Sequence, residues 1–352
     1  MRASALARIL FAVYALLTAY ATLYPMEGWR DPGLSPFAYL SAPWPRYVTR
    51  FDIAINVLGY APYGFLAIAA LHPRVRGVPA FAVATASALA LTLILEALQS
   101  YLPARFASNL DALCNLLGAA AGAVLGLRYA PRLLLEGPVS RVRHGAFLPG
   151  SDIDAGLVLI GLWLFLQLHP GTLLFGAGDL RELLGAREAR GHRAEFFIAI
   201  EALTAAANLT AVALLLAALA GPATPVRAAF AALLGAAVAV KTAAFAILLR
   251  AEDVFTWLTP GAQIGLAAGA LLALGAVALP RFARLPAAAV LIMAATVLVN
   301  LAPPNPYVVA SLKVWQHGHF LNFNGLTRLV SAVWPFAALG YLMVLAARRP
   351  RE

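Results

Sequence analysis

Long apolar stretches alternate with short polar connectors along almost the whole chain. About ten of these stretches approach the roughly 20 residues that a membrane-spanning helix needs. They lie at residues 4–24, 52–71, 79–100, 109–128, 153–169, 195–219, 227–249, 261–279, 285–301 and 327–346. The pattern therefore predicts an all-α, polytopic integral membrane protein with about ten transmembrane helices.

The composition excludes a water-soluble enzyme and a nucleic-acid-binding protein. Of the 352 residues, 62% are hydrophobic and only 12% are charged. The net charge of +10 would suit a nucleic-acid partner, but the basic residues stand singly between apolar runs instead of forming one basic module. They are better interpreted as signals of membrane topology. Cys114 is the single cysteine, which excludes an intramolecular disulfide.

The distribution of arginine and lysine favours a cytoplasmic location for both termini, because connectors that then lie inside carry more basic residues. Arg2 and Arg8 before the first apolar stretch, followed by Ala19-Tyr20-Ala21, also resemble a signal peptide. The apolar stretch is long for a signal peptide, so we expect a retained first span. Cleavage would leave about nine spans.

The spans fall into two groups. Residues 1–130 hold four of them, residues 131–152 form a basic connector on the cytoplasmic side, and residues 153–352 hold the remaining six. No internal repeat is visible, so the inverted-repeat signature of many transporters is not present in the sequence. We expect two transmembrane domains, the second of unknown role.

Polar residues inside apolar stretches are the strongest functional signal, because a carboxylate at a helix centre in lipid costs about 2.5 kcal/mol or more. Span two begins, span three ends and span four begins on one side of the membrane, which the charge distribution makes the outer side. Seven polar residues lie at these three ends: Asp52, Asn56, Glu96, Gln99, Arg105, Asp111 and Asn115. We predict that they form one ligand-binding site, with Arg105 as the contact for an anion.

Helix capping is the competing interpretation of the same residues. Asp52 and Asp111 lie where N-caps are expected, Ser108 or Asn109 can cap span four, and Arg105 can reach the interface. Glu96 and Gln99 lie within an apolar run, so capping does not account for them. This difference favours a ligand site.

The second group of spans contains two deeply placed charges, Glu201 and Lys241, which predict an intramembrane ion pair. Such a pair is either a packing lock, which we favour, or a site for a coupling ion or proton. His317 and His319 have no nearby cysteine or carboxylate, so no metal site is predicted. No cofactor-binding motif is present either, and no cofactor is expected.

Two motifs in the first group resemble the VanZ-like membrane protein family. They are F-D-x3-N-V-L-G-Y-x-P-x-G-F-L over residues 51–66 and E-x2-Q-x2-L-P-x-R-x5-D-x3-N-x2-G-x3-G over residues 96–122. The resemblance covers roughly residues 10–128 and implies a bacterial inner-membrane protein of the cell envelope, in a family named for glycopeptide resistance. Many members have His where this chain has Asn56, which argues against proton transfer at that position. Residues 150–352 look like the extension of longer members.

Our leading hypothesis is a protein that binds or handles an anionic envelope lipid or glycan intermediate at the outer polar site. The expected partners are membrane lipids, including a lipid-linked envelope intermediate, while protein partners are left open. Two alternatives come from other classes. A membrane enzyme acting on a lipid-linked substrate would use Glu96 or Asp111 as a general base, and a structural scaffold would bind other envelope machinery.

Overall fold

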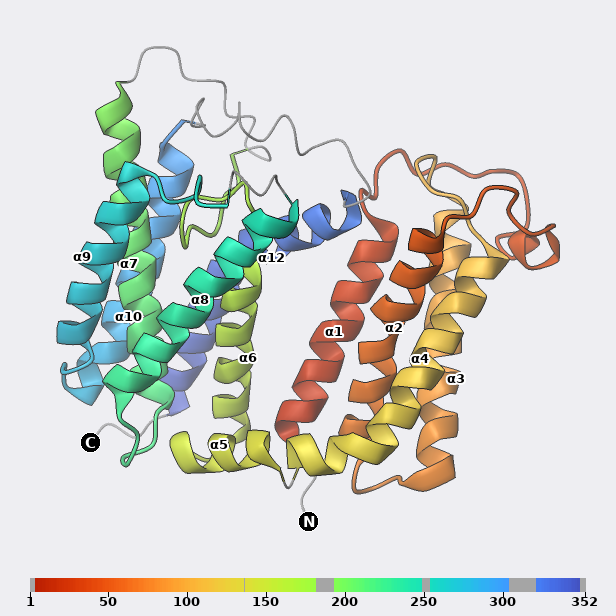
Figure 1. The fold of residues 1–352 in the computed structure, drawn as a ribbon, viewed down its shortest axis with the longest axis horizontal. Helices are drawn as coiled ribbons and strands as arrows, with labels where there is room; N and C mark the ends of the chain where they lie inside the picture. The colour runs from red at the N-terminus through yellow and green to blue at the C-terminus, as the bar shows by residue number, and fades with distance from the viewer. Residues whose placement is uncertain (1–3, 136, 182–192, 249–253, 304–320, 349–352) are drawn as a thin grey trace. The chain divides into compact units, whose positions relative to one another are not determined.

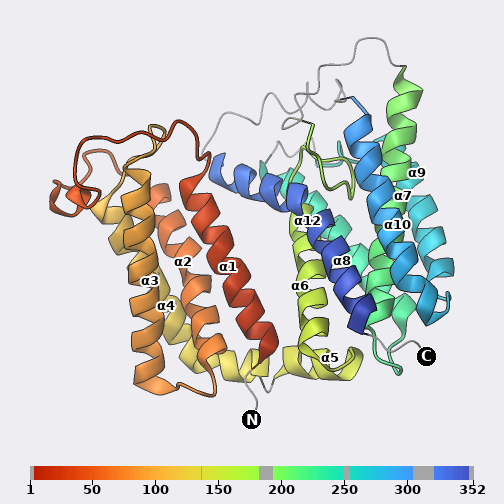
Figure 2. The same ribbon diagram turned by 180° about the vertical axis from the view of Figure 1, so that it is seen from behind.

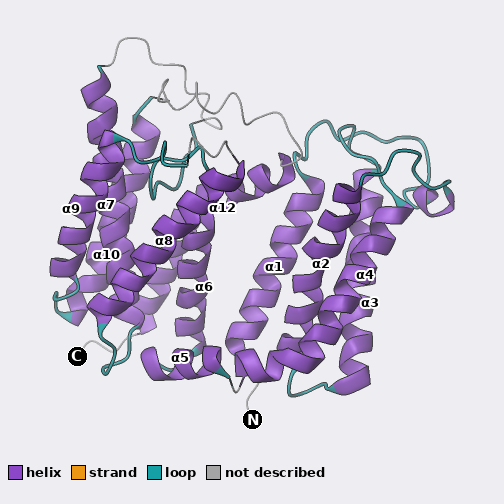
Figure 3. Ribbon diagram, in the orientation of Figure 1, coloured by secondary structure: helices purple, strands orange, loops and turns teal. Residues whose placement is uncertain are grey.

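The computed structural model describes residues 4–135, 137–181, 193–248, 254–303 and 321–348. In these ranges the fold is all-α, as predicted, and no β-strand is present (Figure 3). The chain divides into two compact units, residues 1–145 and 146–352. The boundary falls within the segment that we expected to be a connector, which here contains the π-helical turn η2 (Pro131–Leu135) and helix α5 (Pro138–Ala146).

Eight helices in the described ranges are long and apolar enough to cross a membrane. The predicted count of about ten is therefore not confirmed, although every predicted span coincides with a helix. The difference lies in α6 (Ser151–Leu166) and α9 (Pro260–Ala276), which have 16 and 17 residues. At 1.5 Å per residue such helices extend about 24 to 26 Å, less than the roughly 30 Å of a hydrocarbon core.

The first unit contains α1 (Ala5–Leu23), α2 (Arg50–Leu71), α3 (Gly77–Gln99) and α4 (Asn109–Ala130), joined by loops with one short 3-10 helix, η1 (Ala38–Ser41). In Figure 1 these four helices run side by side with alternating direction. As a result α1 and α3 end where α2 and α4 begin. We call this the polar end of the first unit.

Glycines set the close packing of α2 against α4. A Cβ atom at Gly118 would collide with the backbone of Val57, one at Gly122 with that of Ala61, and one at Gly64 with that of Ala119. Small residues at this spacing allow two helix backbones to approach each other in a membrane. The seam brings the first turns of α2 and α4 together at the polar end.

The second unit contains α6, α7 (Ala194–Leu219), α8 (Val226–Leu248), α9, α10 (Arg281–Leu301) and α12 (Leu321–Arg348). Helix α7 is the most buried candidate span, and α9 and α10 both pack against it (Figure 2). The segment that follows α6 is not helical, yet its residues 174–178 are buried. Phe175 in this segment packs on Trp163 of α6, with 5.1 Å between the ring centroids.

We expect Gly122→Ala to destabilise the first unit, because the added methyl group meets the backbone of Ala61 and backbone atoms cannot move aside cheaply. Overpacking of this kind costs about 1–3 kcal/mol. Gly59→Ala in α2 is the matched control, since nothing lies within 4 Å of a Cβ atom at Gly59. Thermal unfolding of the detergent-solubilised protein measures both. Equal melting temperatures for the two variants would contradict the packing seam.

Candidate functional site

The seven polar residues predicted to share a site all lie at the polar end of the first unit. Asp52 and Asn56 are in the first two turns of α2, and Asp111 and Asn115 are in the first two turns of α4. Glu96 and Gln99 are in the last turn of α3, and the loop before α4 carries Arg105. The directions of the helices in Figure 1 therefore place the residues as the alternation of the spans requires.

Asp52 caps helix α2. Its carboxylate accepts hydrogen bonds from the backbone N–H of Thr49 at 2.9 Å and from the Thr49 hydroxyl at 2.7 Å. The Thr49 hydroxyl in turn accepts the N–H of Asp52, which completes a capping box. Because these contacts engage one carboxylate oxygen of Asp52, the capping interpretation accounts for this residue.

Glu96 joins the end of α3 to the start of α4. Its Oε2 atom accepts the backbone N–H of Ser108 at 2.8 Å, and Ser108 is the N-cap of α4. The first N–H groups of a helix have no partner within the helix, and the helix dipole favours negative charge there. Glu96, only 2% exposed, thus supplies from another helix the contact to the N-cap N–H that Asp52 supplies locally in α2.

Gln99 and Arg105 satisfy the opposite kind of helix end. The Gln99 amide donates to the carbonyl of Thr22 at 2.8 Å, and Arg105 donates from Nε at 2.7 Å and from Nη2 to the carbonyl of Tyr24, the C-cap residue of α1. Partial burial lowers the pKa of Arg105. The sequence-based view that capping does not account for Glu96 and Gln99 was wrong, because their partners are backbone groups of other elements.

One group of buried side chains lies a turn deeper. Asn115, 3% exposed, donates from Nδ2 to the Thr92 hydroxyl at 2.9 Å. The hydroxyl of Tyr60 lies beside Thr92 and close enough to Glu96 for an electrostatic interaction. Within the described residues, neither the Tyr60 hydroxyl nor the Asn115 Oδ1 atom has a hydrogen-bond partner. Asn115 thus belongs to a polar layer with Tyr60 and Thr92.

Comparison with known proteins identifies the first unit. A sequence model of the VanZ/LLP1 family matches residues 11–130, about a third of the chain. The N-terminal block is VanZ-like. It stands in a longer chain, and the resemblance stated from the two motifs is confirmed. No curated protein and no solved structure matches the sequence.

Three residues around the site of the VanZ-like block were missed by the sequence reasoning. Tyr60 and Thr92 each lie one helical turn from a predicted residue, Tyr60 after Asn56 and Thr92 before Glu96, and this spacing could have identified them. Tyr39 in η1 donates to the carbonyl of Leu93 at 3.2 Å, and burial together with the charge of Glu96 raises its pKa. No sequence pattern predicts the contact between Tyr39 and Leu93, because Tyr39 lies in the connection between α1 and α2, which has no periodic pattern.

The described residues contain no group of three or more His, Cys, Asp and Glu side chains that could hold a metal ion. Asp52, Glu96 and Asp111 therefore do not form such a cluster at the polar end. His317 and His319, which we considered from the sequence, lie outside the described residues.

Beyond the VanZ-like block, Glu201 and Lys241 are both buried in the second unit. Their charges interact electrostatically, but each makes its direct contacts elsewhere. Lys241 Nζ donates to the carbonyl of His169 at 2.8 Å and to that of Thr172 at 3.4 Å. These carbonyls belong to the buried, non-helical segment after α6. The two groups therefore interact through their charges, while their described hydrogen bonds go to a helix start and to loop backbone.

Glu201 is held at the start of α9. Its Oε2 atom accepts the Thr259 hydroxyl at 2.6 Å, and that hydroxyl accepts the N–H of Ala262 as the N-cap of α9. A Cβ atom at Gly261 would collide with Glu201, so glycine there lets the carboxylate reach the helix start. The favourable helix dipole at this position stabilises the carboxylate.

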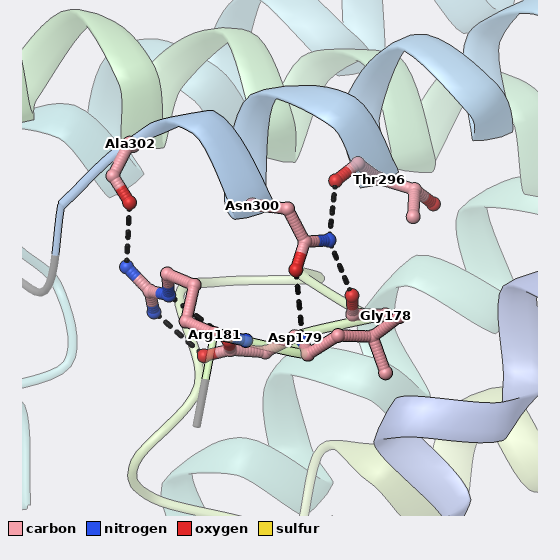
Figure 4. Close-up of polar contacts among 7 residues, drawn as sticks. Gly178, Asp179, Arg181, Thr296, Asn300 and Ala302 are labelled. Atoms are coloured by element: carbon pink, nitrogen blue, oxygen red, sulfur yellow. Dashed lines mark hydrogen bonds and ion pairs between the residues drawn. The ribbon is translucent and has the colours of Figure 1, made fainter. Parts of the chain in front are cut away.

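Asn300 and Arg181 fix the other end of the buried segment (Figure 4). The Asn300 side chain donates to the Gly178 carbonyl at 2.6 Å and accepts the N–H of Leu180 at 2.8 Å. Arg181 donates to the Ala302 carbonyl and forms a bidentate pair with Asp179, at 2.9 and 2.6 Å. Burial alone would raise the pKa of Asp179, but hydrogen bonds and charge from Arg181 lower it. The segment is anchored by Asn300 of α10 and by the contact of its own Arg181 with the carbonyl that follows α10.

We expect Lys241→Met to destabilise the protein more than Glu201→Gln. Methionine removes the ammonium donor from both carbonyls; that of His169 still accepts the Thr172 hydroxyl, whereas that of Thr172 loses its described donor, at a cost of about 1–3 kcal/mol. Glutamine at position 201 still accepts the Thr259 hydroxyl. Thermal unfolding followed by tryptophan fluorescence compares the two. If a direct ion pair were the main contact, both variants would lose the same stability and the double variant would lose no more.

Proposed function

We propose that the VanZ-like block binds the headgroup of an anionic lipid or lipid-linked glycan intermediate of the bacterial envelope. The polar end is the binding site in this proposal, and it faces the outer side of the inner membrane. The family resemblance supports a location in the cell envelope. The side chains of the polar end supply the groups that would bind the headgroup. Handling of such a lipid is one route by which the protein would act in glycopeptide resistance.

The observation that carries the proposal is the position of Arg105. Two of its N–H groups, Nε and Nη2, donate to the carbonyl of Tyr24, which orients the guanidinium at the polar end. The side chain is only partly buried. A guanidinium held in this way matches the geometry of a phosphate or carboxylate group, which it can bind through two parallel hydrogen bonds.

The surroundings of Arg105 support a position at the membrane interface. The loops of the polar end expose large aromatic side chains, among them Trp29, Trp44 and Phe106, the last of which is 88% exposed. Aromatic residues gather where the hydrocarbon core meets the headgroup layer. A site beside them lies at the depth of lipid headgroups.

Native mass spectrometry with lipid identification tests the proposal on the purified full-length protein. Arg105→Gln removes the charge but keeps an amide that can donate to the Tyr24 carbonyl, so the fold should be retained. We expect this variant to lose the lipid that the wild type retains, with an affinity lower by about tenfold, because a charged hydrogen-bond donor is lost. Arg128→Gln, at the other end of α4, is the control and should retain the lipid. Equal retention by Arg105→Gln would refute the assignment of the anion contact.

A further inference from the structure

The polar residues of the VanZ-like block form two layers across three helices. The outer layer contains Asn56, Glu96 and Asp111, and the inner layer contains Tyr60, Thr92 and Asn115. Each inner residue lies four positions from an outer one on the same helix, which places it about 6 Å deeper. The hydrogen bond from Asn115 to Thr92 and the electrostatic interaction of Glu96 with Asp111 connect the helices within each layer.

The two layers contain more acceptors than donors. Glu96 accepts one hydrogen bond, at Oε2, and within the described residues its Oε1 atom accepts none. Asn115 Oδ1 is buried without a partner, and Asp111 adds a second carboxylate that is partly buried. The Tyr60 hydroxyl is the one donor among the side-chain atoms that are buried here without a partner in the described part of the chain.

Buried polar atoms in native proteins are almost always hydrogen-bonded, and an unsatisfied one costs about 1–3 kcal/mol. The Tyr60 hydroxyl can donate to one of these acceptors, and the carboxylate oxygens of Glu96 and Asp111 offer further lone pairs to hydrogen-bond donors from outside the protein chain. A second anionic group would not provide them, because it would face two carboxylates. A hydroxyl or ammonium group provides donors, and an ammonium group would also be attracted by the carboxylates.

We infer that the site selects headgroups that carry a hydroxyl or ammonium donor next to the phosphate. This inference rests on the proposed function. The phosphate lies at Arg105 at the polar end, and the donor reaches inward to Glu96 Oε1, Asp111 and Asn115 Oδ1. Arg105 thus binds the anionic half of one headgroup, and the acceptors of the two layers bind its donor half.

Two matched lipid pairs with identical acyl chains test the inference by native mass spectrometry. Phosphatidylglycerol and phosphatidylmethanol carry the same charge, but only the first has hydroxyl donors. Phosphatidylethanolamine and phosphatidylcholine are both zwitterionic, but only the first has N–H donors. We expect the donor-bearing lipid to bind about tenfold more tightly in at least one pair. The pair that discriminates identifies the donor as hydroxyl or ammonium.

The variant Glu96→Gln tests whether Glu96 causes the preference for the donor-bearing lipid. The glutamine oxygen can still accept the N–H of Ser108, which preserves the cap of α4, while the amide nitrogen places a donor where Oε1 was an acceptor. We expect the preference within the discriminating pair to fall to about twofold or less. Asn115→Leu, which removes the inner acceptor, should lower the preference in the same direction. Thr85→Ala is the control on α3, because the Thr85 hydroxyl donates to its own helix at Phe81, and it should keep the wild-type preference.

The outcomes separate this inference from the proposed function. If the wild type retains lipid but binds both members of each pair equally, the inference fails while lipid binding stands. A preference that survives in both Glu96→Gln and Asn115→Leu would also overturn the inference, because other residues would then bind the headgroup donor. If the wild type retains no phospholipid of any kind, the proposed function fails first.

Discussion

The ends of helices that lie in or near the hydrocarbon core place the strongest constraint on this protein. The first N–H groups and the last carbonyls of a helix have no partner within the helix, and lipid offers none. In the VanZ-like block, Glu96 serves the start of α4, while Gln99 and Arg105 serve the end of α1. In the second unit, Lys241 donates a hydrogen bond to the backbone that follows α6. Most of the ionisable residues inside the apolar stretches have this task.

The same constraint explains which side chains surround the ends of the short helices α6 and α9. A helix that ends before it has crossed the hydrocarbon core exposes backbone groups at depth, and these must be covered by other parts of the protein. The segment after α6 is covered by Lys241 and Asn300, and the start of α9 is covered by Glu201 through Thr259. Glu201 and Lys241 therefore stabilise two interrupted helices, and each has its direct partner at one of them.

The sequence predicted the positions of the helices well, because apolar length is a direct consequence of the membrane. It also placed residues such as Asp52 and Glu96 at one end, since helices that alternate in direction bring these ends together. It could not predict which backbone groups the polar side chains reach. The partners of Glu96 and Gln99 lie 12 and 77 positions away in the chain, and the loops that bring them close carry no periodic pattern.

Capping and ligand binding are compatible at the polar end, and the first favours the second. A carboxylate that accepts one backbone N–H is held in a single orientation, so its second oxygen is already positioned for a ligand. Glu96 has this arrangement, with Oε2 accepting the N–H of Ser108 and the carboxylate close enough to Asp111 for an electrostatic interaction. Binding then requires little further ordering of side chains, which is the main cost that preorganisation removes. A residue that completes a helix end can in this way also determine which ligand a binding site selects.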